Sequence, residues 1–217
     1  MNGAVMKNFV TPDALFASAL VGKGDAFVSE VDESDGSIAR YEPTIAVVNN
    51  IALDHKSMDE LRALFSGFVN RAEIAVLNLD NEETAALVIA TKVRTRTYAL
   101  RSGLADLHCS DIRLAPDGVS FDVIEKDTRE RATVDLAVPG EHNVANALAA
   151  LSAARAYGLS LKDAAEALKG FSGTKRRLEV VGKANNVTVI DDFGHNPDKI
   201  TATLNTLHAF PGRLLIM

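Results

Sequence analysis

Short apolar runs alternate with segments of helical periodicity over the first hundred residues, and this alternation constrains the fold more than any other feature. The apolar runs have the length and composition of strands. We predict these strands at residues 26–31, 44–49, 73–79 and 94–100. Helices are predicted after Ser57, where Glu60 completes a capping box, and around 82–90. Such an order predicts an α/β fold with a mostly parallel sheet and helices on its faces.

The pattern changes near residue 107, where three runs alternate apolar with polar residues. These runs, at 107–114, 119–125 and 131–137, predict an antiparallel meander with one solvated face. Helices are predicted next, at about 141–157 and from Ser160 to near Gly170.

A second series, strand–strand–helix–strand, begins near residue 178. We therefore predict two domains, residues 1–178 and 179–217, with the boundary between about 174 and 186. Residues 213–217 have the pattern of a strand that enters a core, and both ends of the sequence are predicted to be cut inside domains.

Composition narrows the class of protein. The chain has 217 residues, of which 47% are hydrophobic, so it can bury a substantial core. The net charge of −6, with no basic stripe and no Trp, argues against a nucleic-acid partner. No apolar run reaches transmembrane length, so no membrane partner is expected. The single Cys109 fits a reducing compartment, and we expect a cytoplasmic protein.

Four acidic residues fall within residues 30–35, directly after the first predicted strand. Carboxylates that cluster in this way can bind a hard divalent cation such as Mg²⁺. Strand alternation makes Glu30 the acid best placed to face a site. An alternative interpretation is a solvated acidic loop.

Polar residues also follow the strand at 44–49, ending in the pair Asp54-His55. Histidine is a common metal ligand or proton carrier, and a neighbouring carboxylate can orient it. Alternatively, these residues are only the caps of the helix that follows.

Three further segments carry polar or charged side chains at turns. Pro139-Gly140 forces a turn before a helix whose first residues include His142 and Asn143, which could bind a base or sugar or merely cap the helix. Lys175-Arg176-Arg177 lies at the predicted domain boundary, where Arg would suit a phosphate or the run could be a solvated linker.

The third segment is Asp191-Asp192-Phe193-Gly194-His195-Asn196-Pro197, between the apolar run at 187–190 and a predicted helix. Asn196 is a good cap and Pro197 suits the first helical position. Two acids and a His therefore meet a helix N-terminus at the carboxyl end of a strand, where α/β folds bind ligands.

Taken in order, these segments resemble the Mur ligase family. The matching motifs are Glu-x-Asp-Glu-Ser-Asp (30–35), Asn-x-x-x-Asp-His (50–55), Gly-Glu-His-Asn-x-x-Asn (140–146), Gly-x-Lys-Arg-Arg (173–177) and Asp-Asp-Phe-Gly-His-Asn-Pro (191–197). The motifs are divided between the alanine-adding branch and the branch that recycles a whole tripeptide. Asn196 stands where both branches usually have a second His.

The resemblance implies a central ATPase domain followed by the start of a Rossmann-like C-terminal domain. It implies an ATP- and Mg²⁺-dependent ligase that joins an amino acid or peptide to UDP-N-acetylmuramate through an acyl phosphate. Glu30 and His55 would hold Mg²⁺, and His195 would lie near the acyl phosphate. The residues implied in nucleotide binding are His142, Asn143, Arg176, Arg177 and Asp191.

The family's phosphate loop, of the type Gly-x-x-Gly-Lys-Thr, has no match in residues 1–217. We therefore expect that this polypeptide alone does not turn over. Two other functions are compatible with the motifs taken separately. One is a catalytically silent nucleotide-binding module, and the other is a metal-dependent phosphoesterase built on Glu30, Asp32, Asp54 and His55.

Overall fold

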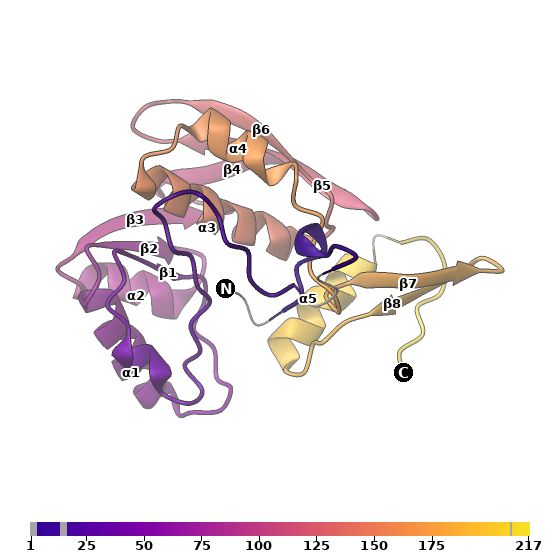
Figure 1. Ribbon diagram of the computed structural model, residues 1–217, viewed down its shortest axis with the longest axis horizontal. Helices are drawn as coiled ribbons and strands as arrows, with labels where there is room; N and C mark the ends of the chain where they lie inside the picture. Colours follow the sequence, from indigo (N-terminus) through magenta and orange to yellow (C-terminus); the bar gives the residue numbers. More distant parts are fainter. Residues whose placement is uncertain (1–3, 14–16, 209) are drawn as a thin grey trace.

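The computed structural model describes residues 4–13, 17–208 and 210–217. Its main element is a six-stranded sheet with the order β1-β2-β3-β4-β5-β6 (Figure 1). The strands are β1 (Ile45–Val48), β2 (Ile74–Asn78), β3 (Arg94–Ala99), β4 (Leu107–Ala115), β5 (Gly118–Glu125) and β6 (Arg131–Leu136). Pairing is parallel from β1 to β4 and antiparallel from β4 to β6. The α/β prediction is confirmed, and the meander joins the parallel strands in one sheet.

Four helices cover this sheet: α1 (Met58–Asn70), α2 (Glu82–Ala90), α3 (Glu141–Tyr157) and α4 (Leu161–Leu168). The predicted capping box is present, because Ser57 accepts from the Glu60 N–H while the Glu60 carboxylate accepts from the Ser57 N–H. Asn81 and Ser160 cap α2 and α4 through their side chains. These local signals explain why the predicted helices form at these positions.

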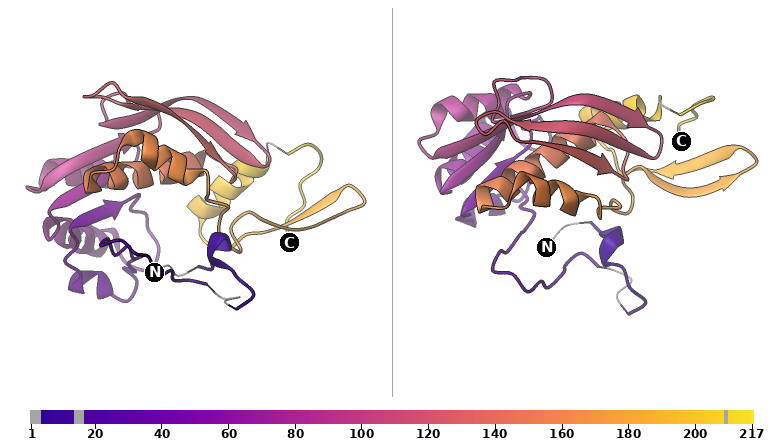
Figure 2. Two further views of the ribbon diagram at one scale, coloured as in Figure 1. Left: turned by 45° about the horizontal axis from the view of Figure 1, so that its top comes forward. Right: turned by 90° about the horizontal axis from the view of Figure 1, so that it is seen from above.

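The sheet buries apolar side chains on both faces. Alternation along β2 sends Val76 into a cluster with α3 and α4, and its neighbours Ala75 and Leu77 into a cluster with α1 and α2. Figures 1 and 2 show the twisted sheet curving around α3, with α1 and α2 on the other side of β1–β3. We call residues 37–168, which include this sheet and its helices, the large unit.

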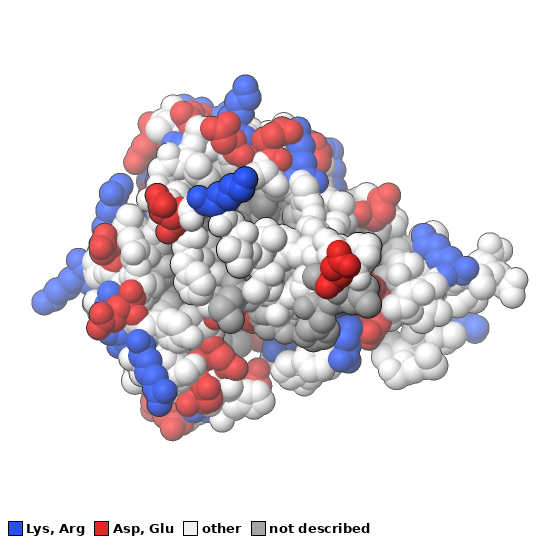
Figure 3. Space-filling model, in the orientation of Figure 1, with Lys and Arg blue, Asp and Glu red and all other residues white. Residues whose placement is uncertain are grey.

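The second sheet is an antiparallel hairpin of β7 (Glu179–Ala184) and β8 (Val187–Asp191), followed by α5 (Pro197–Leu207). As predicted, Asn196 caps α5 and accepts from the Lys199 N–H, with Pro197 in the first turn. We call residues 179–208 the small unit. The hairpin projects away from the large unit in Figure 1, and the same part of Figure 3 is mostly uncharged.

An N-terminal segment that includes a 3₁₀ turn, Lys7–Phe9, lies along the connection between the two units. The Lys7 N–H donates to the Gly173 carbonyl over 3.1 Å, and the Lys175 N–H donates to the Val5 carbonyl over 2.9 Å. A second 3₁₀ turn, Ser37–Arg40, packs near α1. The connection between the units is thus bordered by the first residues of the chain.

Two strand predictions are wrong. Residues 26–31 form no strand, and Phe27 and Val28 are exposed. β1 is an edge strand that pairs only with β2, and this segment does not pair with its free edge. Residues 213–217 are also irregular and exposed, and they pair with no described strand. An apolar run becomes a strand only where its backbone pairs with another strand. Within the described ranges, no helix combines the length and the apolar character needed to cross a bilayer.

Candidate functional site

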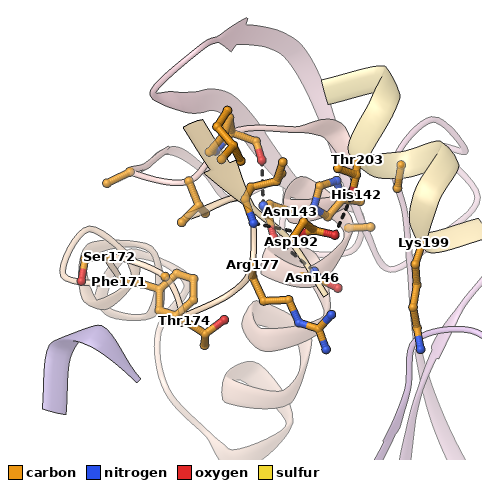
Figure 4. Close-up of a pocket in the computed structure, with 18 of the residues that line it drawn as sticks. His142, Asn143, Asn146, Phe171, Ser172, Thr174, Arg177, Asp192, Lys199 and Thr203 are labelled. Atoms are coloured by element: carbon orange, nitrogen blue, oxygen red, sulfur yellow. Dashed lines mark hydrogen bonds between the residues drawn. The ribbon is translucent and has the colours of Figure 1, made fainter. Parts of the chain in front are cut away.

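A cavity of about 800 Å³ lies where the large unit, the connection and the small unit meet. Asn49, Asn78 and Tyr98 line it from the carboxyl ends of β1, β2 and β3. This is the edge of a parallel sheet at which α/β folds bind ligands. The opposite wall includes Arg177, Asp192, Lys199 and Thr203 (Figure 4). The volume is typical of a small-molecule site.

A chain of amides forms the part of the wall that belongs to the large unit. Asn49 Oδ1 accepts from the Tyr98 hydroxyl over 3.0 Å, and Asn49 Nδ2 donates to Asn146 Oδ1 over 3.3 Å. Asn146 Nδ2 in turn donates to Asn143 Oδ1 over 3.3 Å. Burial raises the pKa of Tyr98 well above its usual range, so the phenol stays a donor. These hydrogen bonds hold the amides of Asn146 and Asn143 on α3 in place relative to Tyr98 at the buried end of β3.

The N-terminus of α3 presents two of the predicted residues to the cavity. Gly140 has φ +100°, a conformation that favours glycine, and Asn143 Nδ2 donates to the Pro139 carbonyl over 2.7 Å. Partial burial lowers the pKa of His142, while the nearby Asp192 carboxylate opposes this shift. A neutral imidazole can both donate and accept, which suits recognition of a base or sugar.

Asp192 was not selected by sequence reasoning. Its carboxylate accepts from the Leu178 N–H (2.9 Å), the Gly194 N–H (2.8 Å) and the Thr203 hydroxyl (3.0 Å). Asp191, the predicted nucleotide-binding residue, lies outside the cavity lining and pairs with Arg176 over 3.5 Å. Consecutive residues at a strand end face opposite ways, so the Asp-Asp pair signals that one of them faces the cavity without saying which.

The two predicted arginines stack on one ring. The guanidinium carbons of Arg176 and Arg177 lie 4.9 Å and 5.5 Å from the centroid of Phe193. Arg177 lines the cavity, and Figure 4 shows it extending away from the group of Asn143, Asn146 and Asp192. Arg176 does not line the cavity. Arg177 is therefore the better placed of the two to reach an anion there.

A second polar group lies beside the cavity, where the loop after β1 meets the start of α5. Asp54, His55 and His195 each offer one atom that could bind a metal ion, and these three atoms all lie within 4.8 Å of one another. Asp54 Oδ1 is 3.4 Å from His55 Nε2, and Asp54 Oδ2 is 3.9 Å from His195 Nε2. The structure thus brings together two of the three predicted catalytic residues, His55 and His195, from different units.

Glu30 lies in the irregular segment that replaces the predicted strand, and it is exposed. Asp32, two residues on, accepts from the Ser34 N–H over 2.7 Å. Hydrogen bonds from Ser34 lower the pKa of Asp32, and the charge of His55 adds a smaller effect of the same sign. Among the described residues, the group of side chains that could hold a metal ion is Asp54, His55 and His195, and Glu30 is not part of it. The metal roles of Glu30 and His55 stay predictions.

Comparisons with known proteins bear on the family of this chain. A model of the Mur ligase middle domain matches residues 5–154. A model described as Mur ligase, glutamate ligase domain matches residues 176–217. The UDP-N-acetylmuramate–L-alanine ligase of Geobacter sp. (strain M21) is 38% identical over 204 residues, which is 91% of this chain and 44% of that protein. The corresponding ligase of Desulfosudis oleivorans is 42% identical over 194 residues, or 86% of this chain and 42% of the relative.

Solved structures show the same fold. The UDP-N-acetylmuramate-alanine ligase of Thermotoga maritima aligns with a TM-score of 0.69 and 26% identity, covering 82% of this chain and 41% of the other. A murein peptide ligase from Psychrobacter arcticus aligns with a TM-score of 0.67 and 27% identity, covering 94% and 47%. The chain spans less than half the length of each of these four proteins. By its matching models and relatives, the chain belongs to the Mur ligase family.

Proposed function

We propose that this chain forms the nucleotide-binding middle domain and the first part of the C-terminal domain of an ATP- and Mg²⁺-dependent ligase. The reaction would join L-alanine to UDP-N-acetylmuramate in peptidoglycan synthesis. The cavity between the strand ends of β1–β3 and the small unit carries the proposal. L-alanine is favoured over a peptide because the curated relatives named above are alanine ligases. The proposal places the division between domains near residue 178 and the protein in the cytoplasm.

The residues have separate tasks in this proposal. ATP would supply the phosphoryl group that activates the muramyl carboxylate, and Mg²⁺ would neutralise charge on the phosphates. Asn143, held by Asn146, would contact adenine, with His142 beside it. Arg177 would bind phosphate oxygens from the connection between the units.

The small unit and the residues predicted to hold Mg²⁺ complete the assignment. Glu30 and His55 would hold Mg²⁺, and His195 would lie near the activated carboxylate. Asp191 and Arg176, paired with each other over 3.5 Å, would contribute on the ribose side. Alignment of the two reactants would account for much of the rate enhancement, since an acyl phosphate needs no covalent help from the protein to react with an amine.

Calorimetry on the 217-residue chain tests nucleotide binding directly. We expect weak binding of ATP that requires Mg²⁺, and at least tenfold weaker binding for Asn143→Ala. Asn70→Ala, which removes an exposed amide on α1, should bind like the original chain. Tight binding of ATP without metal would instead indicate a dedicated nucleotide-binding module.

A coupled assay separates the remaining alternatives. With ATP, Mg²⁺, UDP-N-acetylmuramate and L-alanine we expect no appreciable release of ADP, because residues 1–217 contain no phosphate loop. Appreciable ADP release would contradict this expectation. Hydrolysis of an aryl phosphate in the presence of Mn²⁺ would support a metal-dependent phosphoesterase in place of a ligase.

A further inference from the structure

Asp54 is a residue of the large unit whose carboxylate faces the small unit. It lies in the loop between β1 and α1, and its side chain keeps 22% of its surface exposed. Asp54 Oδ1 contacts His55 Nε2 at 3.4 Å. The second oxygen, Oδ2, faces two donors of the small unit, Asn196 Nδ2 at 3.3 Å and Lys199 Nζ at 3.7 Å. His195 Nε2 lies 3.9 Å from the same oxygen. One carboxylate therefore bridges the predicted metal ligand and the start of α5.

Asn196 suits this junction because an amide both accepts and donates. Its Oδ1 accepts from the Lys199 N–H over 2.9 Å and so caps α5. The same side chain turns its Nδ2 toward Asp54. A carboxylate at position 196 could cap the helix but would repel Asp54. The cap of α5 is thus also an attachment of the helix to the large unit.

Lys199 supplies the charge at the junction. Its ammonium lies 3.1 Å from His195 Nε2 and 3.7 Å from Asp54 Oδ2. The Lys199 ammonium thus contacts both Asp54 and His195, two residues that could also bind a metal ion. The Asp54–Lys199 pair is half-exposed, so its attraction alone is modest. Lys199 shares the acceptor Oδ2 with Asn196, while His55 contacts the other oxygen of the same carboxylate.

We propose that Asp54 is a positioning residue that couples docking of the small unit to the orientation of His55. When Lys199 and Asn196 hold Asp54 Oδ2, the carboxylate plane is fixed and Oδ1 meets the imidazole of His55. When the small unit moves away, Asp54 loses these donors and His55 loses its fixed partner. The role of this coupling in catalysis rests on the proposed function, whereas the coupling itself does not.

Distances between two spin labels test the docking step on the 217-residue chain. Labels at Lys92→Cys and Asn205→Cys report on the large unit and α5, both from exposed positions. Burial raises the pKa of the native Cys109 to about 11, which leaves it poorly reactive toward the label. We expect one narrow distance distribution, broadened at least twofold by Asp54→Ala.

Two further variants separate a specific tie from general damage. Asp59→Ala removes a carboxylate that pairs with Arg62 within α1, and it should leave the distribution unchanged. The exchange Asp54→Lys with Lys199→Asp should restore a narrow distribution that Asp54→Lys alone loses. A distribution for Asp54→Ala equal to that of the original chain would overturn the proposal.

The orientation of His55 is a second readout, which a merely structural role for Lys199 would not move. Lys199→Met keeps an apolar stem and does not alter the 3.4 Å contact between Asp54 and His55 directly. We expect NMR signals of the His55 imidazole to shift in Lys199→Met and to stay unchanged in Asp59→Ala. Unchanged His55 signals in Lys199→Met would contradict the coupling. Failure of ATP binding with coupling intact would instead reject the proposed function alone.

Discussion

The large and small units differ in what holds them together. The large unit buries two clusters of apolar side chains, one on each face of its sheet. In the small unit, Thr206 is the one residue of 179–208 that is buried, and Val180, Val181, Val187 and Val189 are exposed. The two units thus have comparable strand patterns in sequence but very different burial.

The difference indicates that the small unit depends on polar contacts with its surroundings for its position. Asp192 ties the connection to α5, and Asp54 ties α5 to the large unit. Such contacts are weaker than a buried core and are easily exchanged for water. A unit held in this way can change position without unfolding, as a site between two units requires.

The largest expected effect comes from removing core volume in the large unit. Phe121 on β5 is fully buried, and Phe121→Ala should lower the free energy of unfolding by about 3–5 kcal/mol. Val187→Ala on β8, where the residue is 60% exposed, should change it by less than about 0.5 kcal/mol. Urea unfolding followed by circular dichroism measures both. Similar losses for the two variants would contradict the comparison.

The next largest effect on the free energy of unfolding is expected from the substitution of a buried carboxylate. Glu125 is 4% exposed and contacts both Arg96 and Arg155, the latter at 2.6 Å. Glu125→Gln leaves two arginines facing each other and should cost about 3 kcal/mol. Asp191→Asn breaks the exposed pair with Arg176 in the small unit and should cost less than about 1 kcal/mol. In the same unfolding measurement, we expect the loss of stability caused by Asp191→Asn to be smaller at high salt than at low salt, because salt screens the exposed pair. The loss caused by Glu125→Gln should depend little on salt, because that residue is buried.

The features that sequence could predict are those set by nearby residues. Ser57 with Glu60 and Asn196 with Pro197 define helix starts from within four residues, and both form as predicted. The apolar run at 26–31 has an equally clear local pattern, yet it forms no strand. Its state depends on whether the segment packs against the free edge of β1, and no local pattern contains that information.

The candidate site divides in the same way. The motifs identified His142, Asn143 and Arg177, which line the cavity. They did not distinguish Asp192 from Asp191, because that choice depends on how β8 ends against α5. The sequence predicts that Asp54 orients His55 or, in the alternative function, belongs to a phosphoesterase site. Its contacts with the small unit arise from tertiary packing between residues more than a hundred positions apart.

A smaller effect is expected at the contact between the two units. A Cβ on Gly140 would lie 2.4 Å from Thr206 Oγ1, and the φ of +100° is itself unfavourable for alanine. Gly140→Ala should therefore loosen α5, with at least tenfold faster amide exchange there and unchanged exchange in β2. Gly182→Ala on β7 meets no neighbour within 4 Å and serves as the control. Equal acceleration in α5 and β2 would mean that the two units unfold together.

The smallest effect concerns pH. Burial holds the pKa of His142 below its ordinary value of 6.5, so the folded protein binds this proton less readily than the unfolded chain does. This shift contributes stability that is fully present above pH 6.5 and is lost as the pH falls from 6.5 through the pKa of His142 in the folded protein. His142→Gln should reduce this loss when unfolding is measured between about pH 8 and pH 5. Asp192→Asn should have the opposite effect on the slope, because the Asp192 charge raises the pKa of His142. If both variants changed the slope in the same direction, the Asp192 carboxylate would not act on His142, and this electrostatic link between the two units would be absent.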